Sequence, residues 1–147
     1  MKKIFILTLI TLNALLVFGG LGKTYWEIIS GLEDYLIFEH RKLQDGRDCY
    51  NANLYDVIDF EIVGDKNNPD QATIMMGVLN DPDITKVTSM LFAKWLENIT
   101  TVHANSIINW VGDKISESIN KNASKHEKYF SGFLVNIIQL KNLIVVS

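Results

Sequence analysis

The chain has 147 residues, of which 48% are hydrophobic and 21% are charged, and its net charge at pH 7 is −3. This hydrophobic fraction, with three tryptophans, excludes a disordered chain and is sufficient for the core of one globular domain. The slight acidic excess argues against binding to nucleic acid, which needs clustered lysine and arginine. It also argues against docking on anionic lipid.

The amino terminus has the order of features found in a secretory signal peptide. Two lysines precede an apolar run over residues 4–18, and three glycines follow it. The sequence predicts a signal peptide over 1–22, with cleavage after Gly19 or Gly22, and a secreted, extracellular domain over 23–147. An uncleaved membrane anchor is the alternative, but the run is shorter than the roughly 20 apolar residues that span a bilayer.

The next segment predicts a helix over Thr24–Lys42. Apolar residues recur along it at helical spacing and would share one buried face, and Asp45-Gly46 predicts the helix end. The residues on this face are Tyr25, Ile28, Ile29, Leu32, Tyr35, Leu36 and Leu43.

Cys49 is the single cysteine, so the chain cannot form an intramolecular disulfide. In an oxidising compartment, an unpaired cysteine indicates either an intermolecular disulfide, and hence a homodimer through Cys49, or a free thiol. A third interpretation is a half-buried cysteine that packs as a small hydrophobe. Because no disulfide braces it, the domain depends on burial alone, which favours helices with long apolar faces.

The segment over Asn53–Val63 gives two conflicting signals. Asn53 and Gly64 resemble the start and the end of a helix, whereas the residues over 58–62 alternate between apolar and polar, as in a half-buried strand. The helix is favoured because both ends carry helix signals. The alternative is an α+β fold with a strand at Val57–Val63.

Further helices are predicted over the rest of the chain. Proline in the first position favours a helix over Pro69–Leu79. Two helices over Asp83–Glu97 and Val102–Asn120 are separated by a break, because the apolar stripe rotates there and residues 99–102 are β-branched. The last helix covers Ser124–Asn142. The predicted fold is therefore an all-α bundle of about five helices.

Two sequons predict N-glycosylation of a eukaryotic extracellular protein. They are Asn98-Ile99-Thr100 and Asn122-Ala123-Ser124, and neither has proline in the middle position. The predicted break between helices would place Asn98 in an exposed turn, where a glycan fits. Asn98 and Asn122 are therefore the predicted glycosylation sites.

The residue types that carry chemistry do not form a recognisable motif. His40, His103 and His126 lack the spacing of three or four residues that brings two metal ligands to one helix face. The sequence has no nucleophile elbow and no calcium-binding loop. It therefore predicts no catalytic, cofactor-binding or metal-binding residue, no cofactor and no enzyme activity.

The leading functional prediction is a secreted, non-enzymatic helical protein that binds another protein in a glandular, reproductive, salivary or immune fluid. The alternative is a carrier of a small apolar ligand within the helical bundle, because many aromatic residues and methionines could line a cavity. These residues are Trp26, Tyr35, Trp95, Trp110, Phe130, Phe133, Met75, Met76 and Met90. Nucleic acid and stable membrane insertion are excluded as partners.

Overall fold

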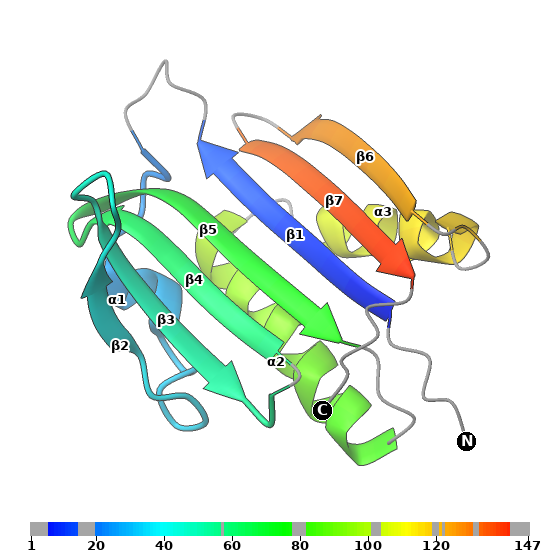
Figure 1. The fold of residues 1–147 in the computed structure, drawn as a ribbon, viewed down its shortest axis with the longest axis horizontal. Coiled ribbons are helices and arrows are strands. Elements are labelled where there is room, and N and C mark those ends of the chain that lie inside the picture. The colour runs from blue at the N-terminus through cyan, green and yellow to red at the C-terminus, as the bar shows by residue number, and fades with distance from the viewer. Residues whose placement is uncertain are drawn as a thin grey trace.

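The computed structural model describes residues 6–14, 20–56, 58–77, 82–100, 104–118, 121, 123–130 and 133–141. These residues combine an antiparallel β-sheet with three helices (Figure 1). The predicted all-α helical bundle is therefore wrong, and the domain is a mixed α/β fold.

The sheet has seven strands in the order β2-β3-β4-β5-β1-β7-β6. β1 occupies an inner position and pairs antiparallel with β5 on one side and with β7 on the other. It therefore joins a four-stranded part, β2 to β5, to a two-stranded part, β7 and β6. The strands are β1 Ile6–Ala14, β2 Glu39–Lys42, β3 Asp48–Leu54, β4 Ile58–Asp65, β5 Asn68–Gly77, β6 Ala123–Phe130 and β7 Phe133–Lys141.

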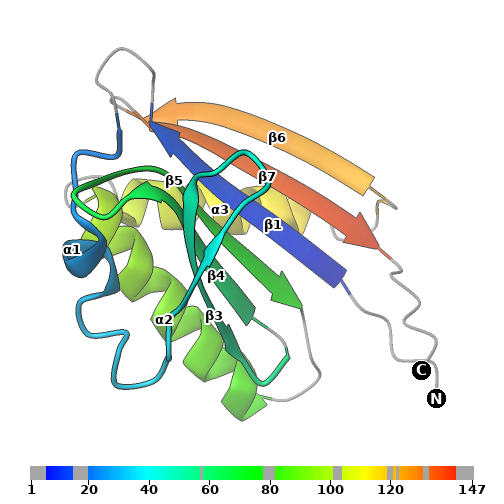
Figure 2. The ribbon, with the colours of Figure 1, turned by 60° about the vertical axis from the view of Figure 1, so that its left-hand side comes forward.

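The helices are α1 Tyr25–Ile29, α2 Pro82–Thr100 and α3 Ala104–Ser118. All three lie on the same face of the sheet, with α1 and α2 behind β3 to β5 and α3 next to β6 and β7 (Figures 1 and 2). The main core lies between this face and the helices, where Trp95 of α2 is fully buried and contacts Phe60 of β4 edge-on at 5.9 Å between ring centroids.

The predicted helix over Asn53–Val63 is wrong, and the alternative with a strand at Val57–Val63 agrees with β4. Ile58, Phe60 and Ile62 are buried beneath the helices, whereas Asp59 and Glu61 point to the opposite face and are only half-buried. Burial of every second side chain is the pattern of a strand covered on one face. The alternation was therefore the stronger signal, and Asn53 and Gly64, which resembled helix ends, lie within β3 and β4.

The predicted helix over Thr24–Lys42 is wrong beyond its first turns. α1 ends at Ile29, and Gly31 has a φ of +74°, a left-handed conformation that stops a helix. Leu32 and Leu36 remain buried because the chain after α1 turns back against the core. The final residues of the predicted helix form the edge strand β2.

The predicted helices over Pro69–Leu79 and Ser124–Asn142 are also wrong, because these segments form β5 and the β6–β7 hairpin. Pro69 lies opposite Gly64, where the β4–β5 register shifts. Proline is tolerated in a strand at such an irregularity because it has no N–H to donate to the ladder. The proline therefore marks a bulge in a hairpin and not a helix start.

Helices do occur near the predicted Asp83–Glu97 and Val102–Asn120, as α2 and α3. The break between them falls later than the sequence predicts, because α2 continues through Thr100 and α3 begins at Ala104. Asn98 consequently lies in the last turn of α2 and not in a turn between two helices.

Candidate functional site

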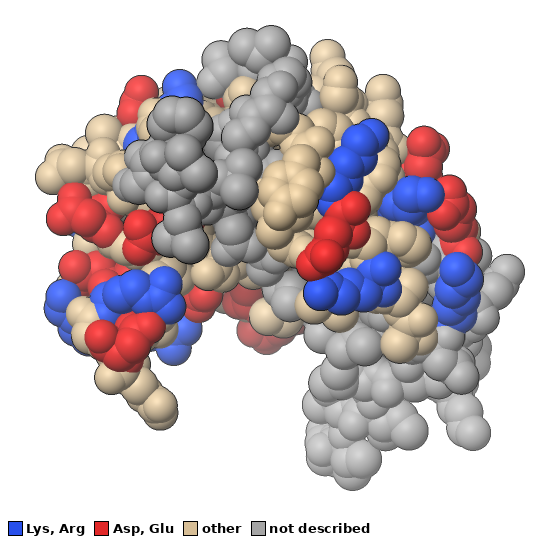
Figure 3. Space-filling view, turned by 90° about the horizontal axis from the view of Figure 1, so that it is seen from above, with Lys and Arg blue, Asp and Glu red and all other residues tan. Residues whose placement is uncertain are grey.

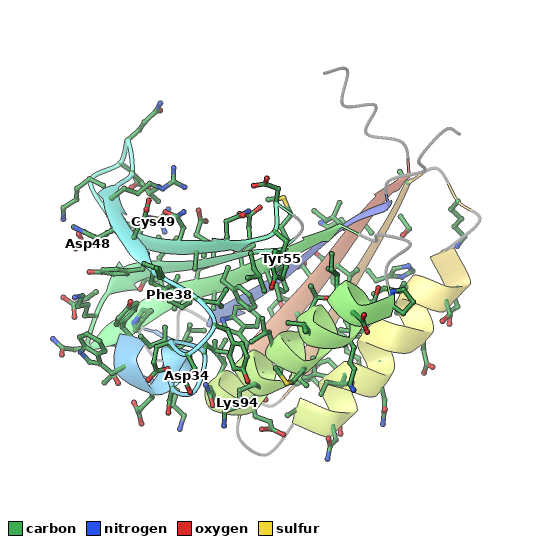
Figure 4. The ribbon with its side chains drawn as sticks, turned by 90° about the horizontal axis from the view of Figure 1, so that it is seen from below. Asp34, Phe38, Asp48, Cys49, Tyr55 and Lys94 are labelled. Carbon is green, nitrogen blue, oxygen red and sulfur yellow. The ribbon has the colours of Figure 1, made fainter. Side chains whose placement is uncertain are left out.

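The face of the sheet opposite the helices carries the polar half of the alternating strands, as the side-chain view in Figure 4 shows from below. In the pairing register Asn51 of β3 lies opposite Glu61 of β4, and Glu61 lies opposite Thr73 of β5. Side chains at paired positions project to the same face. A cavity of about 170 Å³ opens here, lined by Arg41, Asn51, Asp59, Phe60, Glu61, Thr73 and Met75.

Hydrogen bonds position the polar groups of this cavity, which we name the open-face cavity. Arg41 Nη2 donates to Glu61 Oε2 at 3.0 Å, and Asn53 Nδ2 donates to Asp59 Oδ1 at 2.7 Å. Thr73 Oγ1 accepts from Gln71 Nε2 at 3.0 Å. Each of these hydrogen bonds to Asp59 and Glu61 uses one carboxylate oxygen, and an ionised carboxylate can accept further hydrogen bonds. The cavity is therefore supplied mainly with acceptors.

The charges of the open-face cavity are one guanidinium and two carboxylates. The guanidinium belongs to Arg41. Contacts with Cys49 and Glu61 raise the pKa of Arg41, so its side chain stays protonated at every physiological pH. With both carboxylates ionised the cavity carries a net charge of −1. Seen from above in Figure 3, lysine and arginine side chains are interleaved with acidic ones, so this side of the molecule has mixed charge.

Cys49 lies on β3 directly opposite Arg41 and is fully buried (Figure 4). Burial raises the pKa of its thiol, while the hydrogen bond from Arg41 works in the opposite direction. A protonated, buried thiol is a poor nucleophile. The intermolecular disulfide through Cys49 stays a prediction, and forming it would require the β2–β3 edge to open first.

The structure gives Asn98 a second role besides that of predicted glycosylation site. Its side-chain Nδ2 donates to the carbonyl oxygens of Ile28 at 2.9 Å and Ser30 at 2.8 Å, and so joins α2 to the end of α1. A glycan would replace one of these two N–H groups, so it could form only if this contact rearranged. Asn122, the other predicted glycosylation site, lies outside the described residues.

The structure does not bring the predicted aromatic lining together into one cavity. Trp95 is in the main core, whereas Trp110 contacts Phe130 at 5.7 Å between α3 and β6. Trp26 and Tyr35 are exposed near α1. Among the predicted lining residues whose side chains the structure describes, Met75 alone lines the open-face cavity. The side chains of Met76 and Phe133 lie outside this description.

The polar residues of the open-face cavity were not singled out from the sequence, although a signal was present. The alternation over 58–62 puts Asp59 and Glu61 on one face of a strand. Their partners Asn51 and Thr73 come from other strands, and a pairing register between strands cannot be obtained from one sequence. Because the segment over Asn53–Val63 was interpreted as a helix, the alternation over 58–62 did not lead to this pair of carboxylates.

The described part of the chain lacks two further features. Among its histidine, cysteine and acidic side chains, no group of three is close enough together to hold a metal ion. None of its helices combines the length and the apolar character required to cross a membrane.

Comparison with known proteins finds no protein-family model that matches the sequence, no curated protein with significant similarity and no significant match among solved structures. Function therefore has to be argued from the geometry described above.

Proposed function

We propose that the protein is a non-enzymatic binder of a small, positively charged ligand, held in the open-face cavity. The observation that carries this proposal is the convergence of Asn51, Asp59, Glu61 and Thr73, from three adjacent strands, on one cavity that no described helix covers. Four such residues offer oxygen acceptors to one ligand. The proposal develops the alternative drawn from the sequence, a carrier of a small ligand, but with a cationic ligand on the sheet in place of an apolar ligand inside a helical bundle.

The volume of the cavity limits the size of the ligand. At about 170 Å³, the cavity is smaller than the roughly 300–1,000 Å³ of sites for drug-sized molecules. A small primary or secondary amine fits this space, because its N–H groups can donate to the carboxylates while its carbon atoms contact Met75.

An apolar ligand suits the open-face cavity less well. Arg41, Asp59 and Glu61 would each lose hydration on contact with a hydrocarbon, and burial of charged groups without partners is costly. A cationic ligand replaces that hydration with charge-assisted hydrogen bonds.

Titration calorimetry of the full chain with a panel of small amines tests this proposal, with alcohols of the same shape as neutral comparisons. Asp59→Asn should weaken amine binding by about tenfold, because a hydrogen bond to a charged group contributes about 1.5–3 kcal/mol. Glu117→Gln on α3 removes the same charge elsewhere on the surface and should change little. Failure of every amine to bind, or equal weakening by both variants, would contradict the proposal.

Protein binding, the leading prediction from the sequence, is a second candidate with a different observation behind it. Trp26, Tyr35 and Ile37 are 63%, 53% and 85% exposed within α1 and the segment that follows it. Large exposed apolar residues are enriched in protein interfaces. Affinity capture from the native fluid, compared between the full chain and Ile37→Asp, tests this function. The control is Tyr129→Asp, an exposed position far from α1. Equal retention of the partner by the two variants would count against protein binding through this surface.

Export from the cell also remains a proposal, because it rests on the residue pattern over 1–22. In the structure Ile6–Ala14 of this segment form β1, and the buried Leu21 donates its N–H to the carbonyl of Pro69 at 2.7 Å. Cleavage after Gly19 would remove β1 and keep Leu21, whereas cleavage after Gly22 would remove both. Amino-terminal sequencing of the natural protein distinguishes these products from an intact chain, whose recovery would oppose export by this route.

A further inference from the structure

A second cluster lies apart from the open-face cavity, on the helix side of the sheet. Tyr25 and Trp26 of α1 and Tyr50 of β3 surround the ammonium group of Lys66, which belongs to the turn between β4 and β5. Lys66 Nζ is 5.3 Å from the ring centroid of Tyr25, 5.1 Å from that of Trp26 and 5.2 Å from that of Tyr50. All three distances are within the roughly 6 Å over which an aromatic face attracts a cation.

The inner part of this aromatic cage is held rigidly. Tyr25 and Tyr50 are only 5% and 6% exposed, and their ring centroids are 4.6 Å apart. Phe38 contacts Tyr25 edge-on, and His40 stacks on Tyr50 with 5.0 Å between centroids. Trp26 forms the exposed outer wall. The rings are therefore in place before any ligand arrives, which lowers the entropic cost of binding.

Lys66, in contrast, is held weakly. Its side chain is exposed, and within the described part of the chain it forms no ion pair with a carboxylate. An ammonium group with three N–H donors is strongly hydrated, so Lys66 can move into water at little cost. The cage thus already binds a cation, but one that is easily displaced.

We propose that Tyr25, Trp26 and Tyr50 bind a quaternary ammonium group, and that Lys66 is a built-in competitor which this group displaces. A quaternary ammonium has no N–H for water to solvate, so it gains more from aromatic faces than the lysine does. The proposal concerns a different site from the open-face cavity and does not depend on ligand binding there.

Choline is the probe, titrated into the full chain while NMR follows the ring signals of Tyr50, which every variant keeps, and the indole N–H signal of Trp26 where that residue is present. Lys66→Ala removes the competitor and should tighten choline binding by about three- to tenfold, while Trp26→Leu should weaken it at least as much. The matched control is Lys128→Ala, because Lys128 Nζ lies 4.9 Å from a single ring, that of Phe130, and its removal should have no effect.

Two comparisons make the outcome decisive. The neutral analogue 3,3-dimethylbutan-1-ol has the shape of choline without its charge and should bind much more weakly. Asp59→Asn should leave the choline titration unchanged, so a failure at one site is not confused with a failure at the other. The urea-unfolding midpoint of Trp26→Leu should match that of the parent, which shows that the variant is folded.

A trimethyl-lysine amide, compared with choline, identifies the source of the ammonium group. Tighter binding of choline assigns the site to a free small molecule, and tighter binding of the amide assigns it to a modified side chain. The proposal is overturned if neither compound binds even to Lys66→Ala, or if the neutral analogue binds as well as choline.

Discussion

Individual side chains join elements that are far apart in the sequence. Asn98 is an example, because its amide links α2 to two carbonyl groups at the end of α1. Backbone carbonyls at the end of a helix have no partner within the helix. A side chain supplied by another element therefore completes α1 in place of a local cap.

Asn98→Ala should lower the free energy of unfolding by about 1–3 kcal/mol, since two neutral hydrogen bonds are lost at about 0.5–1.5 kcal/mol each. Urea unfolding followed by tryptophan fluorescence measures this change. The matched control is Asn109→Ala, which removes an exposed asparagine within α3 and should cost almost nothing. Equal stability of the two variants would show that the Asn98 contacts contribute little.

The burial of single residues was easier to predict than their secondary structure. Of the seven residues expected on a buried face, five are buried, although only three of these belong to α1, whereas Tyr35 is exposed and Leu43 is half-buried. The five buried residues are Tyr25, Ile28, Ile29, Leu32 and Leu36. Hydrophobic residues find the core whichever backbone carries them. The polar residues of the open-face cavity have no comparable signal, because their proximity depends on strand pairing.

At the scale of elements, the sequence predicted helices more reliably than strands. α2 and α3 could be predicted because their apolar stripes depend only on local spacing. β5, β6 and β7 could not, since their stability comes from partners elsewhere in the chain. Asn53 and Pro69 resemble helix starts but lie in β3 and β5, and such resemblances produced the predicted all-α bundle.

The shortest helix, α1, depends on its cap. Thr24 and Glu27 form a capping box in which the Thr24 N–H donates to Glu27 Oε2 at 2.7 Å and the Glu27 N–H donates to Thr24 Oγ1 at 3.2 Å. An isolated helix of five residues is unstable because nucleation is unfavourable. Capping and packing therefore determine whether α1 forms.

Thr24→Ala should lower the free energy of unfolding by about 1 kcal/mol, within the 0.5–2 kcal/mol range of lost N-caps. It should also weaken the aromatic cage, because α1 carries two of its rings. Thermal unfolding measures the first effect and choline titration the second. Ser116→Ala, an exposed position within α3, is the control; a stability change no larger than that of the control would show that the capping box is dispensable.

At the scale of the whole molecule, the two exposed edges of the sheet carry charged residues. β2 contains Glu39, His40, Arg41 and Lys42, and β6 contains Lys125, Glu127 and Lys128. Charged side chains discourage pairing of an edge strand with another copy. Several of the charges are paired, as in the contact of Lys42 Nζ with Asp48 Oδ1 at 2.8 Å.

These charges predict how stability depends on pH in acid. The hydrogen bond from Lys42 lowers the pKa of Asp48, and those from Arg47 and Lys114 lower the pKa values of Asp45 and Glu117. A carboxyl group with a lowered pKa in the folded state stabilises the protein above its unfolded pKa of about 4. This contribution should be lost as pH falls through the lower, folded pKa.

The loss of stability at alkaline pH has the opposite cause, because it comes from groups whose pKa values are raised in the folded state. Burial raises the pKa values of Cys49, Tyr25 and Tyr50, so above about pH 8.5 the unfolded chain loses protons that the folded chain retains. Urea-unfolding midpoints from pH 3 to 10 should therefore be constant between about pH 5 and 8 and fall on both sides. Cys49→Ala should reduce the fall of the urea-unfolding midpoint at alkaline pH. An increase of this midpoint between pH 9 and 10 would contradict the prediction.

The inner position of β1 also decides when the fold can be completed during synthesis. Ala14 lies opposite Phe133 in the register, so one side of β1 stays unpaired until the ribosome has made almost the whole chain. Contacts between such distant segments form slowly. If residues 1–22 act as the proposed signal peptide, capture of this strand for secretion would compete during that interval with its insertion into the sheet. The relative speed of these two events would then decide where each newly made molecule ends up.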